Sequence, residues 1–71
     1  MEHDIMTLEE YALSRGMIKV KHGHYKTSDG RAYIEQWFLG GKANWYVFNS
    51  NGDIVGVENN LALATNVAME V

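Results

Sequence analysis

The sequence predicts an α+β domain in which a four-stranded antiparallel meander carries an N-terminal and a C-terminal helix on one face. Between Ile18 and Val57, runs of β-branched and aromatic residues alternate with turn signals at Asp29-Gly30, Gly40-Gly41 and Asn51-Gly52. Such dipeptides between such runs are the strongest short-range indication of hairpins. Helical stretches precede and follow the meander. The predicted order is therefore α-β-β-β-β-α, a two-layer sandwich.

Both predicted helices begin at a capping signal. Thr7, followed three residues later by Glu10, forms a capping box, and Gly16 supplies the left-handed residue that ends a helix over about 8–15. Asn59 or Asn60 caps a second helix over about 61–69. Helices this short are unstable alone, so both are expected to pack on the sheet, while residues 1–6 form a flexible N-terminus. The residues predicted to be buried from the helices are Ile5, Leu8, Tyr11, Ala12, Leu61, Ala64, Val67 and Ala68.

The register of the hairpins decides which side chains are buried. A two-residue turn at Asp29-Gly30 would place Lys19 and Lys21 on the same face as Ile34. A three-residue loop over 28–30 with a bulge at the glycine instead keeps both lysines out of the core, and we adopt it. A three-residue loop over 50–52 follows from the same reasoning. The buried face is then predicted to comprise Ile18, Val20, Ala32, Ile34, Phe38, Trp45, Val47, Val55 and Val57.

The opposite face of the predicted sheet is the candidate binding surface, because it is rich in aromatic side chains. Contiguous exposed apolar patches mark interaction sites, and Trp, Tyr and Arg dominate binding hot spots. The alternative interpretation is that cross-strand aromatic pairs only stabilise a small sheet. The predicted partner-binding residues are Lys19, Lys21, Tyr25, Arg31, Tyr33, Trp37, Tyr46 and Phe48, and Glu35 and Ile54 are predicted to share their face.

Composition and charge indicate one globular domain of 71 residues. The hydrophobic and charged fractions, 46% and 21%, are those of a folded protein rather than a disordered one. The net charge is −3, but all six Lys and Arg residues lie between Arg15 and Lys42, so the first hairpin is basic. No apolar run approaches the ~20 residues of a membrane span, and cysteine is absent. We therefore expect a cytoplasmic protein without a membrane partner.

The sequence offers little for catalysis or metal binding. Without cysteine there is no thiolate nucleophile, and none of the three serines stands in a nucleophile-elbow pattern. Gly40-Gly41-Lys42 lacks the spacing of a phosphate loop. His22 and His24 lie two apart on one predicted strand and would point the same way, but no third ligand accompanies them. We predict no enzyme activity, no metal site and no cofactor.

The expected function is that of a small intracellular protein-binding module, an adaptor or inhibitor that occupies the surface of a partner protein. Compact acidic domains of this kind are common among the small gene products of phages and mobile elements, which suggests such an origin by association alone. Two alternatives remain. One is a binder of single-stranded nucleic acid that uses the basic aromatic face, although a pI near 5.4 gives it a weak electrostatic footprint. The other is a homodimer that buries the same face against its own copy.

Overall fold

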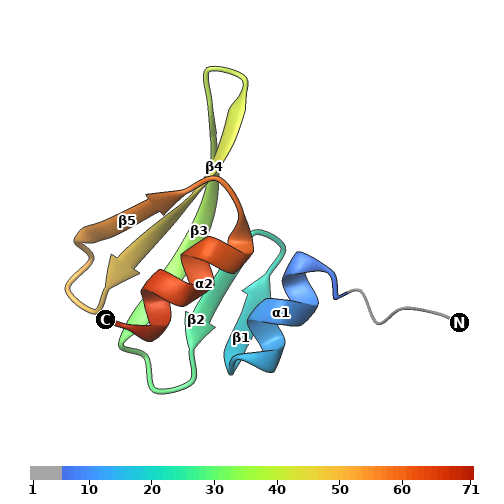
Figure 1. Cartoon of the computed structure of the whole chain (residues 1–71). Coiled ribbons are helices and arrows are strands. Elements are labelled where there is room, and N and C mark those ends of the chain that lie inside the picture. Colours follow the sequence, from blue (N-terminus) through green and yellow to red (C-terminus); the bar gives the residue numbers. More distant parts are fainter. Residues whose placement is uncertain (1–5) are drawn as a thin grey trace, which may run out of the picture.

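The computed structural model describes residues 6–71, which form two helices and five strands (Figure 1). The strands make one antiparallel sheet in the order β1-β2-β3-β4-β5, and both helices lie on the same face of it. The predicted α+β class and the flanking helices are confirmed. The predictions for residues 1–5, Ile5 included, fall outside the described residues. The elements are α1 (Leu8–Ser14), β1 (Met17–Lys21), β2 (His24–Thr27), β3 (Ala32–Leu39), β4 (Lys42–Asn49), β5 (Ile54–Glu58) and α2 (Leu61–Met69).

The helix ends carry the caps that the sequence predicts. Thr7 Oγ1 accepts a hydrogen bond from the Glu10 N–H at 3.0 Å, and Glu10 Oε1 accepts one from the Thr7 N–H at 2.9 Å. Asn60 Oδ1 accepts from the Leu63 N–H at 2.9 Å, which starts α2. After α1 the chain turns at Gly16, whose φ of +100° favours glycine. These caps fix where each helix begins relative to the sheet.

The hydrophobic core lies between the helices and one face of the sheet. Ile34 on β3 and its cross-strand partner Val47 on β4 are fully buried there. Leu8, by contrast, is 49% exposed although it is predicted to be buried, because α1 packs at the edge of the sheet, against β1 and α2. The core comprises Ala12, Met17, Tyr25, Ala32, Ile34, Val47, Leu61, Ala64 and Ala68, with Val67 and Trp45 partly buried against it.

The sheet has five strands rather than the predicted four. The predicted first strand is interrupted at His22-Gly23, where Gly23 has φ +79° and its carbonyl accepts a hydrogen bond from the Gln36 N–H at 2.9 Å. Lys21 pairs with His24 across this turn. His22 and His24 therefore do not share a strand, and the prediction that both point the same way from one strand is wrong.

The register between β2 and β3 also differs from the prediction. Tyr25 stands opposite Ile34, which is the register of a two-residue turn at Asp29-Gly30 and not that of the predicted three-residue loop. The connection spans residues 28–31, and the Thr27 hydroxyl closes it by lying 3.2 Å from both the main-chain N and O of Ala32. This buried polar contact stabilises a loop of four residues, whereas the predicted loop has three.

The change of register reverses the faces of β1. Ile18 and Val20 are predicted to be buried but are 43% and 58% exposed. Met17 and Thr27, which are cross-strand partners, are buried instead, at 3% and 2% exposed. Since successive strand residues point to opposite faces, a shift of one position exchanges the two sets.

A β-bulge in the β4–β5 pair shifts the register of β5, and this is a second difference from the predicted register. The loop over 50–52 has the predicted three residues, but beyond it Val47 pairs with Gly56 instead of Val55. Val55 and Val57 are therefore 44% and 49% exposed, although both are predicted to be buried. The bulge brings a glycine, rather than a valine, under α2.

The β3–β4 hairpin extends beyond the rest of the sheet (Figure 1). Its two-residue turn, Gly40-Gly41, has φ values of +58° and +79°, as a tight hairpin requires, and confirms the prediction. Neither β2 nor β5 pairs with residues 37–44, so these residues form a two-stranded ribbon. Phe38, predicted to be buried, lies on this ribbon and is 72% exposed, because no helix covers it.

Thr65 provides a test of the core. It is fully buried in α2, and its hydroxyl has no hydrogen-bond partner among residues 6–71. Thr65→Val is expected to raise the free energy of unfolding by about 1 kcal/mol, because it keeps the shape and removes an unpaired buried hydroxyl. Urea denaturation measures this, with Thr65→Ala as a control that should destabilise by opening a cavity. A Thr65→Val protein less stable than wild type would contradict the unpaired state of the hydroxyl.

Candidate functional site

One face of the sheet lies away from both helices, and we call it the open face. Cross-strand partners share a face, so the register assigns its members directly. The open face comprises Ile18, Lys21, His24, Lys26, Tyr33, Glu35, Trp37, Leu39, Lys42, Asn44, Tyr46, Phe48, Ile54 and Val57.

Four rings on β3 and β4 form a continuous line across the open face, the aromatic row. Tyr33 and Phe48 are stacked, with ring centroids 4.9 Å apart and planes at 11°. Trp37 continues the row, with centroids 5.9 Å from Phe48 and 4.6 Å from Tyr46. Phe48 is only 7% exposed, whereas Trp37 is 39% exposed. The row therefore packs as a small layer of its own, with the indole of Trp37 presented to the outside.

Glu35 is the one carboxylate of the open face, and it lies beside the aromatic row. Its Oε1 accepts a hydrogen bond from Trp37 Nε1 at 2.9 Å. Its Oε2 lies 3.9 Å from His24 Nδ1, which is beyond hydrogen-bonding distance. One carboxylate oxygen thus orients the indole, and the other keeps acceptor capacity for a further donor.

Aliphatic side chains lie on the two outer strands of the open face. Ile18 on β1, and Ile54 and Val57 on β5, are between 43% and 50% exposed. Between β1 and β3 the surface holds a depression of 280 Å³, whose lining includes Val20, Tyr33 and Glu35. The open face thus carries the aromatic row and the aliphatic side chains of β5 next to one another, and it is hollowed on the other side of the row, where Lys21, His24 and Lys26 lie.

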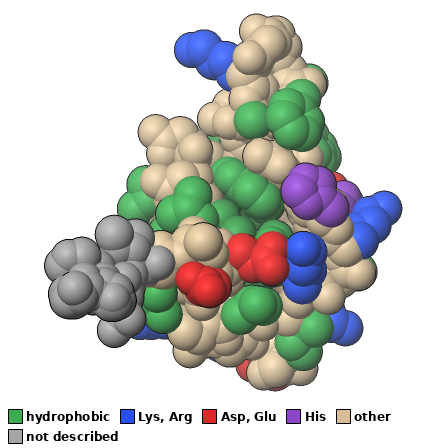
Figure 2. Space-filling model, turned by 90° about the vertical axis from the view of Figure 1, so that its right-hand side faces the viewer, with side chains coloured by type: hydrophobic (Ala, Val, Ile, Leu, Met, Phe, Trp, Pro, Cys, Tyr) green, Lys and Arg blue, Asp and Glu red, His purple; other side chains and the backbone are tan. Residues whose placement is uncertain are grey.

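Two residues predicted for the binding face, Lys19 and Tyr25, lie on the helix side instead. Lys19 Nζ is 3.0 Å from Glu9 Oε1 in α1. The Tyr25 hydroxyl donates to the same oxygen at 2.9 Å, and the Tyr25 side chain is 3% exposed. Figure 2 views the molecule from the edge formed by α1 and β1 and shows acidic and basic side chains next to one another there. The two residues tie α1 to the sheet.

This cluster shifts the ionisation of both its acids. Burial, followed by the hydrogen bond to Glu9, raises the pKa of Tyr25 to about 12. The hydrogen bonds from Lys19 and then from Tyr25 lower the pKa of the Glu9 carboxyl. At neutral pH the contact is therefore a neutral phenol and an ammonium donating to one carboxylate, which is a structural arrangement rather than a reactive one.

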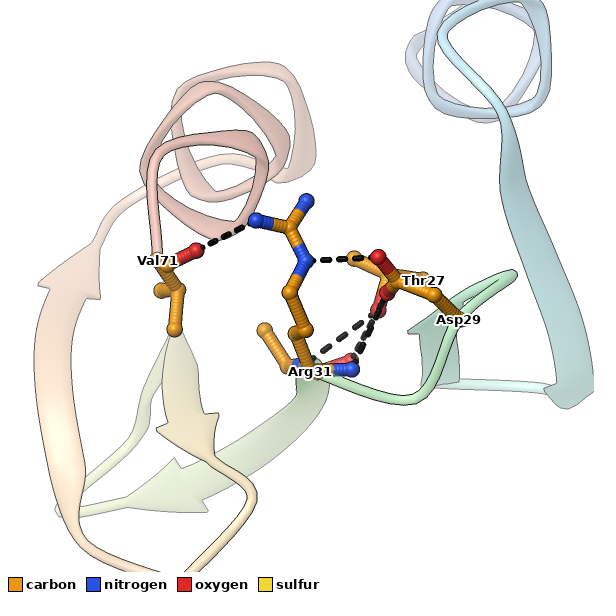
Figure 3. A network of polar contacts seen from close by, with 5 residues as sticks. Thr27, Asp29, Arg31 and Val71 are labelled. Carbon is orange, nitrogen blue, oxygen red and sulfur yellow. Dashed lines mark hydrogen bonds and ion pairs between the residues drawn. The ribbon is translucent and has the colours of Figure 1, made fainter.

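Arg31, also predicted for the binding face, belongs to the β2–β3 loop (Figure 3). Its Nε lies 2.6 Å from Asp29 Oδ2, and its Nη1 donates to the main-chain oxygen of Val71 at 2.7 Å. The main-chain N–H of Arg31, the Thr27 hydroxyl and the guanidinium all lower the pKa of Asp29. Arg31 thus links the loop to the chain after α2, and its place on the binding face is a wrong prediction.

Five of the eight predicted residues come together on the open face: Lys21, Tyr33, Trp37, Tyr46 and Phe48. The role of these five in binding stays a prediction. Sequence reasoning missed Ile18, Lys26, His24 and Val57, which the register adds to the same face. The signal that could have found the first two is Gly23, whose position between two histidines marks the turn that sets their register.

Comparisons with known proteins identify no family for this chain. No protein-family model, no curated protein and no solved structure matches this chain. Within residues 6–71, no three His, Cys, Asp or Glu side chains form a group that could hold a metal ion. Neither helix of this part of the chain has the length and apolar character that crossing a bilayer requires.

Proposed function

We propose that this protein is a cytoplasmic protein-binding module that acts without catalysis, as an adaptor or inhibitor whose open face docks on a partner protein. The observation that supports this proposal is the aromatic row together with the adjoining Ile54 and Val57 of β5, on a face that neither helix covers. A contiguous apolar surface of this kind is unusual for a small domain that works alone.

The exposed side chains of the open face contribute little to folding as long as water contacts them. Burying a large apolar side chain completely is worth about 1.5–3 kcal/mol. Trp37 at 39% exposed and Val57 at 49% exposed retain much of that energy for a partner. Trp37 also packs between Phe48 and Tyr46, and Glu35 already accepts its indole N–H, so it is held in place before binding. Such fixed aromatic side chains are typical binding hot spots.

The open face fits a protein better than a single-stranded nucleic acid. Lys21 and Lys26 would favour phosphate, but Glu35 stands beside the aromatic row and would repel it. The stacked rings of Tyr33 and Phe48 cover one face of each other, which leaves less ring surface for bases. We therefore keep nucleic-acid binding as an outcome to be tested.

The test compares Trp37→Ala with Leu63→Ala. Leu63 is 44% exposed on α2, similar to the 39% of Trp37, but it lies in the helix layer. A partner captured from the cells that produce the protein is purified, and its Kd is measured by calorimetry. We expect Trp37→Ala to weaken binding at least about 30-fold, since hot-spot aromatic residues contribute ~2 kcal/mol or more. Leu63→Ala should stay within about twofold.

Thermal melts of both variants accompany the binding data. Trp37→Ala should remain folded and lose about 1 kcal/mol, from its contacts with Tyr46 and Phe48. Equal affinity of Trp37→Ala and wild type would contradict the open face as the binding surface. Binding of a single-stranded oligonucleotide that weakens steeply with salt would favour the nucleic-acid alternative instead.

A further inference from the structure

We infer that the partner seated on the open face is a second copy of this chain, with the β3–β4 ribbon of each copy lying in the depression of the other. This inference rests on the proposed function, since it names the occupant of the same face. It is based on two complementary features that the fold places on one molecule, a protruding apolar ribbon and an apolar depression with a carboxylate.

The protruding part is the side of the ribbon that continues the open face. Leu39 and Lys42 are cross-strand partners, and by strand alternation they lie on the same side as Trp37. Leu39 is 57% exposed and stands next to the turn at the tip. In a dimer whose open faces meet, this side of the ribbon would point at the second copy, while Phe38 would point away from it.

The receiving part is the depression between β1 and β3. Its 280 Å³ is lined by Val20 and Tyr33, and Glu35 stands at its wall. Val20 is 58% exposed in the isolated chain. An aliphatic side chain such as Leu39 entering this space would cover Val20 and Tyr33, which are otherwise in contact with water.

Between the two parts one pair of opposite charges can form, Lys42 of the ribbon with Glu35 of the depression. Lys42 is the only charged residue in the stretch 36–52 of the sequence. Glu35 is the only acid that lines the depression, where Lys26 and His24 also stand, and its Oε2 has no hydrogen bond within the described residues. When Leu39 enters the depression, its cross-strand partner Lys42 comes with it and can pair with that oxygen.

A second copy satisfies these features better than an unrelated protein does. In a two-fold symmetric dimer the contact of Leu39 with the depression and the pair of Lys42 with Glu35 each occur twice. A chain of 71 residues also has a thin core, so burying an apolar sheet face between copies supplies burial that a single copy lacks.

Sedimentation equilibrium of the purified full chain, up to ~100 μM, tests this inference. Wild type should behave as a dimer, and Leu39→Asp should weaken the dimer at least about tenfold. Phe38→Asp is the matched control, because Phe38 is the neighbouring exposed residue on the other side of the same ribbon. It should leave the dimer unchanged. A monomeric wild type, or equal effects of both substitutions, would overturn the inference.

A charge exchange tests the pairing itself. Glu35→Lys and Lys42→Glu should each weaken the dimer at least about tenfold, and the double variant should recover most of that loss. Failure of the double variant to recover would overturn the placement of the ribbon. A monomeric wild type whose binding to a different protein still depends on Trp37 would contradict this inference and support the proposed function, so the two can fail separately.

Discussion

Ile34→Ala is expected to lower the free energy of unfolding by about 2–5 kcal/mol, which is a large part of the stability of so small a domain. Ile34 is fully buried at the centre of the sheet, between its cross-strand partners Tyr25 and Val47. The substitution leaves a cavity under α2 that small neighbours such as Ala64 and Ala68 cannot fill. Urea denaturation followed by circular dichroism measures the change.

Val20→Ala is the matched control, because Val20 is an aliphatic strand residue that is 58% exposed. It should change the free energy of unfolding of the monomeric chain by no more than about 0.5 kcal/mol. The register with the predicted three-residue loop would bury Val20 beside Ile34 and would make both substitutions costly. Similar losses in the two variants would therefore contradict the pairing of Tyr25 with Ile34.

The part of the fold that the sequence predicts well is the β3–β4 hairpin. The Gly40-Gly41 turn allows one short connection, and its length sets the pairing of every residue from Ala32 to Asn49. The aromatic row consists of residues of these two strands alone, which is why Tyr33, Trp37, Tyr46 and Phe48 are all placed on the correct face. A local turn signal was sufficient here because no bulge intervenes.

The remaining strands depend on interactions that are not local in the sequence. The strand before Asp29 breaks at Gly23, where the chain gains a hydrogen bond to Gln36 on β3. The β2–β3 loop takes an even number of residues because the Thr27 side chain bonds to the main chain of Ala32. Neither contact has a signature in a hydrophobic pattern. The pattern alone therefore favours the loop length that keeps the lysines away from the core, and this length gives the wrong register.

Lys19 lies on the helix side of the sheet because α1 supplies a partner for it. The helix places Glu9 where the Lys19 ammonium and the Tyr25 hydroxyl both reach it. A lysine on the helix side of an edge strand thus has a partner and stays partly exposed, so it carries no penalty for burial. The misplaced binding residues Lys19 and Tyr25 share this one cause, while Arg31 was misplaced because it belongs to a loop rather than to a strand.

The bulge places Gly56 opposite Val47 and close to α2, and a side chain at this position is expected to have a second large effect on stability. Gly56 faces Val67 of α2, and a Cβ at position 56 would lie 2.9 Å from Val67 Cγ1. Gly56→Ala is therefore expected to lower the free energy of unfolding by about 1–3 kcal/mol through overpacking. Elsewhere in a strand the same substitution would stabilise by roughly 0.5–1 kcal/mol, because glycine is disfavoured in strand interiors.

Val67→Ala in combination with Gly56→Ala identifies the cause of this loss. Val67 is β-branched and cannot easily turn away from the new methyl group, whereas alanine leaves room for it. Val67→Ala alone should destabilise, since Val67 packs against the core. The double variant should lose less than the sum of the single losses, by about 1 kcal/mol or more, in urea denaturation of all four proteins. Additive losses would mean that Gly56 is required by the backbone of the bulge and not by the approach of α2 to the sheet.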